Sequence, residues 1–353
     1  MNQPSVSIIV PIYNVEQYVE DCICSVMRQT YDGPIECILV DDCGTDNSMV
    51  VVDRIISEYH GPISFKILRH DNNRGLSAAR NTGMDAASGD YYFFLDSDDE
   101  LTDDCIEKLT KPLETEWYDV VIGNVQCYKI FPSGQQESIK SHLELPINND
   151  MQLDFQIRMR MIYRWKNMTA WNRLFRSGFI RQYHLQFKEG LLYEDQLWSF
   201  QLACLASSFY VMNHITYHYK LREGSISFPH NMQKYIKNLQ IIIKEMSLFV
   251  DNYHIDKKDI FGVFKLFFTK ILNYHSTSIS DYVSTYKKNR PFFKVSIKHI
   301  IYMNGFHINA ILHDLHFIMP AFIAPYLQYL IYKIEHVKSL FLTKYRVYDR
   351  NIY

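Results

Sequence analysis

The first hundred residues alternate between short apolar runs and segments whose apolar residues recur at helical spacing. The apolar runs predict buried strands, at Val6–Val10, Cys37–Val40, Phe65–Leu68 and Tyr91–Leu95. The segments between them predict helices that begin near the capping residues Asn14, Asp46 or Asn47, and Ser77. This strand–helix alternation is the signature of a parallel sheet with right-handed crossovers.

From about Asp103 the alternation loosens but continues. It predicts further strands at Asp119–Cys127, Trp171–Phe175 and Tyr210–Tyr219. Further helices are predicted at Leu153–Tyr163 and Leu191–Ala206. Beyond Pro229–Met232 every pattern is helical, most clearly between Ile260 and Leu272. We therefore predict an α/β domain at residues 1–230, with a mostly parallel sheet flanked by helices. A mainly α-helical C-terminal region follows at residues 231–353.

Polar side chains collect where the predicted strands end, at Tyr13, Asp42, Arg74 and Asp98. The carboxyl ends of parallel strands share one rim, which is where open α/β sheets bind ligands. The last of these ends carries Asp96, Asp98 and Asp99, whose mutual repulsion a divalent cation would offset. The alternative interpretation is an acidic turn that caps the next helix.

Net charge and cysteine content limit which partners and which cellular compartment fit the chain. The 353 residues carry a net charge of −2, so no basic field indicates nucleic acid as a partner. The seven cysteines include no Cys-x-x-Cys pair, which favours reduced thiols in a cytosolic protein. Met1–Ser5 is polar and leads directly into a strand, so we predict no signal peptide and a cytoplasmic location.

The segment 315–332 has no Asp, Glu, Lys or Arg, although Pro320 and Pro325 argue against a simple membrane span. Basic residues follow it, at Lys333, Lys338, Lys344 and Arg346. Residues 315–346 therefore fit peripheral contact with the inner face of the cell membrane. A buried helical hairpin or a contact within a homo-oligomer explains the same pattern.

Four motifs in order resemble the family 2 glycosyltransferases, which are inverting enzymes of the GT-A fold. They are Val6–Asn14 (VSIIVPIYN), Val40–Asp46 (VDDCGTD), Asn73–Gly83 (NRGLSAARNTG) and Leu95–Asp99 (LDSDD). The resemblance is strong from Val6 to about Leu113. Weaker matches to bacterial capsule, exopolysaccharide and cell-wall transferases continue to about Ser227, at Trp171–Phe175, Tyr193–Asp195 and Arg222–Ser225. Cys43 and Gly44 depart from the commoner small polar residues of the second motif.

The resemblance implies a binding site for a nucleotide-sugar donor, usually a UDP-sugar. Its expected members are Pro11, Tyr13, Asn14, Asp42, Arg74, Arg80, Asp96 and Arg222. Tyr13 would stack on the base with Pro11 and Asp42 beside it. Arg74, Arg80 and Arg222 would lie near the phosphates, and Asp96 near the ribose or the donor sugar.

The resemblance also implies the metal and the base. Asp98 would bind Mn²⁺ or Mg²⁺ with Asp99 supporting it, and Asp195 would deprotonate the acceptor beside Glu194. Single displacement needs this set, because one group must neutralise the departing diphosphate and another must activate the acceptor hydroxyl. Glu194 or Asp195 must then fold back over the sheet rim. The acceptor would be a glycan or a lipid-linked sugar in bacterial surface polysaccharide synthesis.

Two other functions use the same kind of sheet. A nucleotidyltransferase normally has a glycine-rich, basic first loop for a triphosphate, which Pro11–Asn14 does not supply. A non-catalytic partner subunit would keep the nucleotide fold without turnover, although every candidate acidic residue is present.

Overall fold

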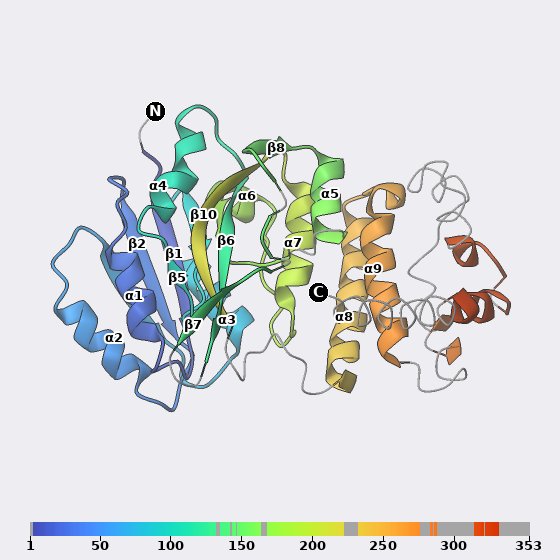
Figure 1. The fold of residues 1–353 in the computed structure, drawn as a ribbon, viewed down its shortest axis with the longest axis horizontal. Helices are drawn as coiled ribbons and strands as arrows, with labels where there is room; N and C mark the ends of the chain where they lie inside the picture. Colours follow the sequence, from blue (N-terminus) through green and yellow to red (C-terminus); the bar gives the residue numbers. More distant parts are fainter. Residues whose placement is uncertain are drawn as a thin grey trace, which may run out of the picture. The chain divides into compact units, whose positions relative to one another are not determined.

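The computed structural model describes ten stretches of the chain, which form two compact units, Met1–Pro229 and His230–Tyr353. Figure 1 shows the first as a sheet covered by helices and the second as helices. The described residues are 3–131, 135–141, 143–145, 147–163, 168–221, 232–275, 283–284, 286–287, 314–320 and 322–331.

One 10-stranded sheet forms the centre of the first unit, in the order β3-β2-β1-β4-β9-β6-β10-β5, with β7 on β6 and β8 on β10. Its strands are β1 (Val6–Ile12), β2 (Ile35–Asp41), β3 (Ser64–Arg69), β4 (Tyr91–Phe94), β5 (Glu100–Leu101), β6 (Val120–Ile130), β7 (Gln136–Ile139), β8 (Met151–Leu153), β9 (Arg173–Arg176) and β10 (Phe209–Leu221).

The predicted parallel arrangement holds for β3, β2, β1 and β4. Beyond β4 the sheet is mixed rather than mostly parallel. Strand β9 runs antiparallel between β4 and β6, and β10 is parallel to β6 but antiparallel to β5. The apolar runs predicted these strands as buried, but hydrophobicity does not encode their direction, so the mixed half was not foreseen.

Helices cover both faces of the parallel half. Ile8 and Val10 of β1 join the core formed with α1 (Val19–Met27), α2 (Ser48–Ser57) and α4 (Cys105–Thr110). Ile9 points the other way, toward α3 (Leu76–Ala86), because successive strand side chains alternate between faces. A Cβ atom on Gly83 would lie 2.3 Å from Cγ2 of Ile9. Only glycine therefore allows α3 to approach β1 this closely.

The other described elements complete both units. They are η1 (Lys111–Glu114), α5 (Phe155–Tyr163), α6 (Ser177–Gln182) and α7 (Glu194–Leu205), then α8 (Met232–Asn252), α9 (Lys257–His275) and η3 (Leu315–Phe317) in the second unit. The helical spacing after Ile260 is confirmed, because Val263, Phe267 and Ile271 are buried on α9. Among the residues described, no helix is both long and apolar enough to cross a bilayer.

Two predicted helix starts are wrong. Asn14 does not cap α1, which begins at Val19 after Tyr18. The φ angle of Asn14 is +52°, outside the helical region, and its Oδ1 accepts a 2.8 Å bond from the Thr45 N–H. The third helix is preceded by Gly75 with a φ angle of +87°, rather than capped by Ser77. In both places the turn conformation serves contacts between loops instead of a helix cap.

Candidate active site at the sheet rim

The loops that leave β1, β2, β3 and β4 meet at one rim, because these strands are parallel neighbours. Tyr13 follows β1 and is 47% exposed, unusual for an aromatic ring beside buried Pro11 and Ile12. Asn14 ties this loop to the loop after β2 through its bond to Thr45. The rim thus presents one exposed aromatic face on a fixed backbone.

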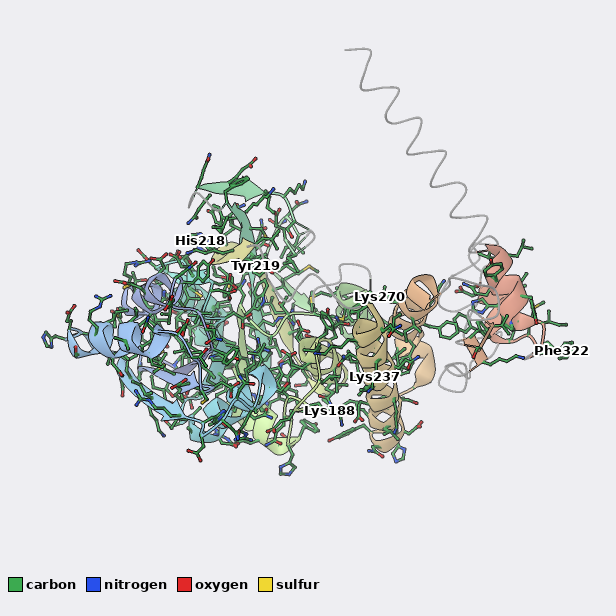
Figure 2. The ribbon with its side chains drawn as sticks, turned by 90° about the horizontal axis from the view of Figure 1, so that it is seen from below. Lys188, His218, Tyr219, Lys237, Lys270 and Phe322 are labelled. Atoms are coloured by element: carbon green, nitrogen blue, oxygen red, sulfur yellow. The ribbon has the colours of Figure 1, made fainter. Side chains whose placement is uncertain are left out.

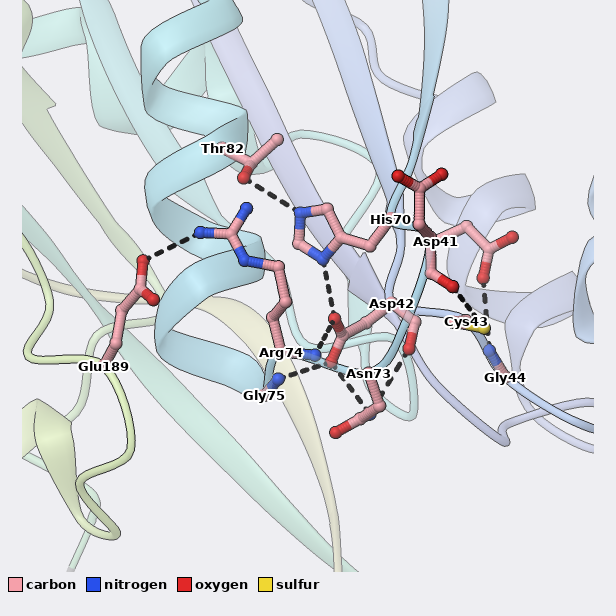
Figure 3. Close-up of polar contacts among 11 residues, drawn as sticks. Asp41, Asp42, Cys43, Gly44, His70, Asn73, Arg74, Gly75, Thr82 and Glu189 are labelled. Carbon is pink, nitrogen blue, oxygen red and sulfur yellow. Dashed lines mark hydrogen bonds and ion pairs between the residues drawn. The ribbon is translucent and has the colours of Figure 1, made fainter.

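Asp42 holds the loop after β3 in place (Figure 3). One carboxylate oxygen lies 2.7 Å from Nδ1 of His70 and accepts a 2.8 Å bond from the Arg74 N–H. The other oxygen accepts bonds from Nδ2 of Asn73 at 2.9 Å and from the Gly75 N–H at 2.7 Å. A carboxylate has about four accepting positions, so this network uses the capacity of Asp42.

Asp41, one residue earlier, is placed differently. Its side chain is partly exposed, and its carboxylate accepts a 3.3 Å bond from the Gly44 N–H and lies 3.9 Å from Nε of Arg69. The Arg74 side chain is also exposed and pairs with Glu189 at 3.1 Å, across to the segment before α7 (Figure 3). Asp41 and Arg74 therefore both keep contact with solvent at the rim.

The acidic turn after β4, which we define as Asp96–Asp99, does not present its carboxylates equally. Asp96 and Asp98 are partly exposed, whereas Asp99 is 1% exposed. The Asp99 carboxylate accepts a 2.8 Å bond from the Tyr217 hydroxyl and a 2.7 Å bond from the Lys220 N–H. Burial, followed by the charges of Asp98 and Asp96, raises the pKa of Asp99 well above its usual value.

Arg80 of α3 joins the acidic turn to the start of α7. Its guanidinium donates to Asp96 at 2.7 Å and to Glu194 at 2.6 Å, and it lies over the Phe187 ring at 5.1 Å. The Arg80 side chain is 3% exposed. Burial acts to lower the pKa of Arg80, but Asp96 and Glu194 raise it above its usual value, so the guanidinium stays charged. Both of its terminal nitrogens are used within the protein.

The α7 start is fixed by two further features. Tyr193 precedes Glu194 with a φ angle of +61°, a costly left-handed conformation for a tyrosine. Asn81, next to Arg80, holds the incoming segment with two 2.9 Å bonds to the backbone N–H and carbonyl of Phe187. The Phe187 ring stacks on Trp198 of α7 at 4.2 Å. Consecutive residues of α3 thus hold the segment that carries the candidate base.

The electrostatic surroundings of Glu194 and Asp195 favour a base that holds its proton strongly. Burial raises the pKa of Glu194, and the Arg80 guanidinium opposes that rise. Burial, then the neighbouring Glu194 charge, raises the pKa of Asp195 to about 8, with Arg80 acting in the opposite direction. A carboxylate with a raised pKa is a stronger base, which suits proton abstraction from a hydroxyl.

The structure brings the predicted site residues into contact in two groups, one of which joins Asp42 to Arg74. Asp96, Arg80 and Glu194 are in direct contact, and Asp195 follows Glu194. Arg222 lies outside the described residues. The sequence motifs did not assign a role to His70, Asn81 or Tyr217, which all hold neighbouring groups in place. Of these three, only Asn81 had a signal in the sequence, because it follows Arg80 directly.

The acidic turn has the right chemistry for a hard divalent cation. Among the described residues, no three His, Cys, Asp or Glu side chains converge as a ready-made metal site. Mg²⁺ sites commonly use one or two carboxylates and complete their shell with substrate phosphates and water. The partly exposed Asp98 fits that pattern, whereas Asp99 is committed to Tyr217 and Lys220. The donor set therefore fits a cation shared with a diphosphate.

Replacing Arg80 with Met should lower the free energy of unfolding by about 3–5 kcal/mol, because Asp96 and Glu194 would lose their buried partner. The matched control is Arg74→Met, which breaks the exposed Arg74–Glu189 pair and should cost at most about 1 kcal/mol. Urea unfolding followed by tryptophan fluorescence measures both, since all four tryptophans lie before Pro229. Equal losses in the two variants would contradict the buried bridge.

The model of the family "Glycosyl transferase family 2" matches residues 7–185, just over half of the chain. Among the relatives, the chain is 31% identical to Glycosyltransferase GlyG of Streptococcus pneumoniae over 233 residues, 63% of this chain and 72% of GlyG. It is 30% identical to Glycosyltransferase GlyA of the same organism over 224 residues, 63% of this chain. That match spans 31% of GlyA, less than a third of its length.

Solved structures show the same fold. The crystal structure of S. aureus TarS 1–349 in complex with UDP-GlcNAc aligns with a TM-score of 0.58 at 17% identity, covering 85% of this chain and 92% of that one. This likeness confirms the predicted GT-A-type α/β architecture. With the family match over the four rim motifs and the relatives at 30% identity and above, it follows that the chain is a member of glycosyl transferase family 2.

Proposed function

We propose that the chain is an inverting transferase that moves a sugar from a UDP-sugar to a hydroxyl of a glycan or lipid-linked acceptor, in the synthesis of a bacterial surface polysaccharide. The observation that carries this proposal is the Arg80 bridge, because it sets the residue before Asp195 against the acidic turn. The diphosphate that leaves at the acidic turn and the base at the start of α7 would then lie beside the same sugar.

The rim supplies the donor contacts in this proposal. Tyr13 stacks on the uracil, as its exposure allows, and Arg74 exchanges Glu189 for the diphosphate. We assign the polar contact to the base to Asp41 in place of Asp42, because the carboxylate of Asp42 is fully used by the loop after β3. Asp42 then acts as the support that keeps Arg74 at the rim.

Asp98 is the residue that would hold Mn²⁺ or Mg²⁺ together with the diphosphate oxygens. The ion, when bound, neutralises the charge that grows on the leaving diphosphate. Asp195 takes the proton of the acceptor hydroxyl, and Arg80 holds the Glu194 side chain in place beside it. Arg80 is thus assigned to the protein's own carboxylates rather than to the donor phosphates.

The relatives favour this proposal over the two alternatives. TarS was solved with UDP and with UDP-GlcNAc, and the named relatives are glycosyltransferases. A nucleotidyltransferase would release pyrophosphate, whereas sugar transfer releases a nucleoside diphosphate. A non-catalytic subunit would bind the donor and release neither product.

Asp195→Asn should lower the transfer rate by about 10²–10⁴-fold, because the amide cannot accept the hydroxyl proton. Binding of UDP, measured by calorimetry, should stay within about twofold of the wild type, since the rim is untouched. Glu194→Gln is the matched comparison. Its transfer rate should fall less than that of Asp195→Asn, because this variant only weakens the bridge to Arg80. A fully active Asp195→Asn variant would remove this residue from the base role.

The raised pKa of Asp195 predicts the pH dependence of kcat/KM. Only the deprotonated carboxylate can act as a base, so kcat/KM should rise with pH and level off above about pH 8. Rates measured from pH 5 to pH 10 with subsaturating UDP-sugar would show this limb. A profile that is already flat above pH 5 would contradict a base with a raised pKa.

We further propose that residues 315–346 contact an anionic membrane. Phe322, Tyr326 and Leu330 follow one another at intervals of four residues and are 69%, 52% and 57% exposed. Phe322 is drawn at the surface of its unit in Figure 2. The basic residues from Lys333 onward lie outside the described part of the chain but supply charge complementary to anionic lipid.

Replacing Phe322 and Leu330 together with Ser should release the protein from vesicles of anionic lipid in a flotation assay. The loss follows from removing side chains whose burial is worth about 1.5–3 kcal/mol each. Val50→Ser, at an apolar position of α2 that is 68% exposed, is the control and should float as the wild type does. A wild type that stays unbound and elutes as a stable oligomer would assign the apolar side chains to self-association.

A further inference from the structure

The hydroxyl of Tyr217 touches both ends of the acidic turn. Tyr217 lies in β10 and is completely buried. Its hydroxyl donates to Oδ2 of Asp99 at 2.8 Å and accepts the backbone N–H of Asp96 at 3.3 Å. Within the turn, the Asp99 N–H also donates to the Asp96 carbonyl at 3.0 Å. One side chain from a distant strand therefore fixes the turn on either side of Asp98.

Asp99 is an anchor in this arrangement. Its second carboxylate oxygen accepts the Lys220 N–H, so both of its oxygens bond to β10. Asp98 lies between the two anchored positions along the turn and is partly exposed. Fixing Asp96 and Asp99 leaves Asp98 little freedom to move.

The Tyr217 ring is itself held in place. Trp171 stacks on it with ring centroids 4.6 Å apart and an interplanar angle of 14°, and the Trp171 ring also stacks on Tyr219, two residues along β10, at 5.4 Å. Asn172 follows with a φ angle of +61°, and its side chain donates to the carbonyls of Gly123 and Asn124 and accepts from Thr216. The Trp171–Asn172 segment is therefore held against both β6 and β10 beside Tyr217.

We infer that Tyr217 is a positioning residue, which sets the acidic turn so that Asp98 faces the cation and the diphosphate, with Asp99 as its anchor rather than a metal ligand. This inference rests on the metal-assisted transfer proposed above. A phenol suits the task because it donates to the carboxylate and accepts the amide at the same time. Phenylalanine would fill the same space under Trp171 and lose both bonds.

The test is Mn²⁺ binding to the whole 353-residue chain in the presence of UDP, measured from the electron paramagnetic resonance signal of free Mn²⁺. Tyr217→Phe should weaken Mn²⁺ binding by roughly tenfold or more, because groups that orient a metal ligand without touching the ion commonly contribute about 10- to 100-fold to metal affinity. Tyr91→Phe is the matched control. It removes another buried hydroxyl, whose bond to the Tyr118 carbonyl is also 2.8 Å long, at the opposite end of β4.

Hydrogen exchange at the Asp96 amide gives a second measurement that needs no ligand. Exchange should accelerate in Tyr217→Phe and stay at the wild-type rate in Tyr91→Phe, because only the first variant loses the acceptor of that N–H. Equal Mn²⁺ affinity in Tyr217→Phe and the wild type would overturn the positioning role while leaving the metal site intact. A wild type that binds no Mn²⁺ with UDP would overturn the metal-assisted function itself, and the positioning role with it.

Discussion

The site depends on one buried ionic interaction, in which the guanidinium of Arg80 lies between the carboxylates of Asp96 and Glu194. Desolvating a charge costs several kcal/mol, which only good partner geometry repays. Here the geometry comes from three separate elements, since α3 supplies the cation while the β4 end and the α7 start supply the anions. The interaction therefore fixes the distance between two loops that the sequence places about a hundred residues apart.

The packing beneath α3 makes this interaction feasible. Gly83 lets the helix lie directly on Ile9 of β1, and the neighbouring Ala78 and Ala79 are completely buried. A helix held so closely cannot shift Arg80 away from the β4 end without breaking the core. Asn81, on the next position, holds the Phe187 backbone, so α3 controls the approach to α7 as well. The motif Asn73–Gly83 is thus a scaffold for the candidate site at the rim of the sheet.

The sequence predicted the positions of groups along the chain better than their partners. Strand ends at Asp42 and Asp96 were visible because apolar runs stop abruptly at polar residues. The use of Asp42 was not visible, since its partner His70 follows the separate strand β3 and hydrogen bonds leave no trace in hydrophobic periodicity. The role of Tyr217 was hidden for the same reason, because it acts through hydrogen bonds. The antiparallel direction of β9 was not visible either, because a buried strand shows the same apolar pattern in both directions.

A double-mutant cycle on Arg80 and Glu194, using Arg80→Met, Glu194→Gln and the double variant, tests the Arg80 bridge most directly. The free energy of unfolding, read from tryptophan fluorescence in urea, gives the interaction energy between the two side chains. Direct buried contact between the two side chains predicts a coupling of at least about 1 kcal/mol. Additive losses, within about 0.5 kcal/mol, would show that Arg80 does not hold the start of α7 against the sheet.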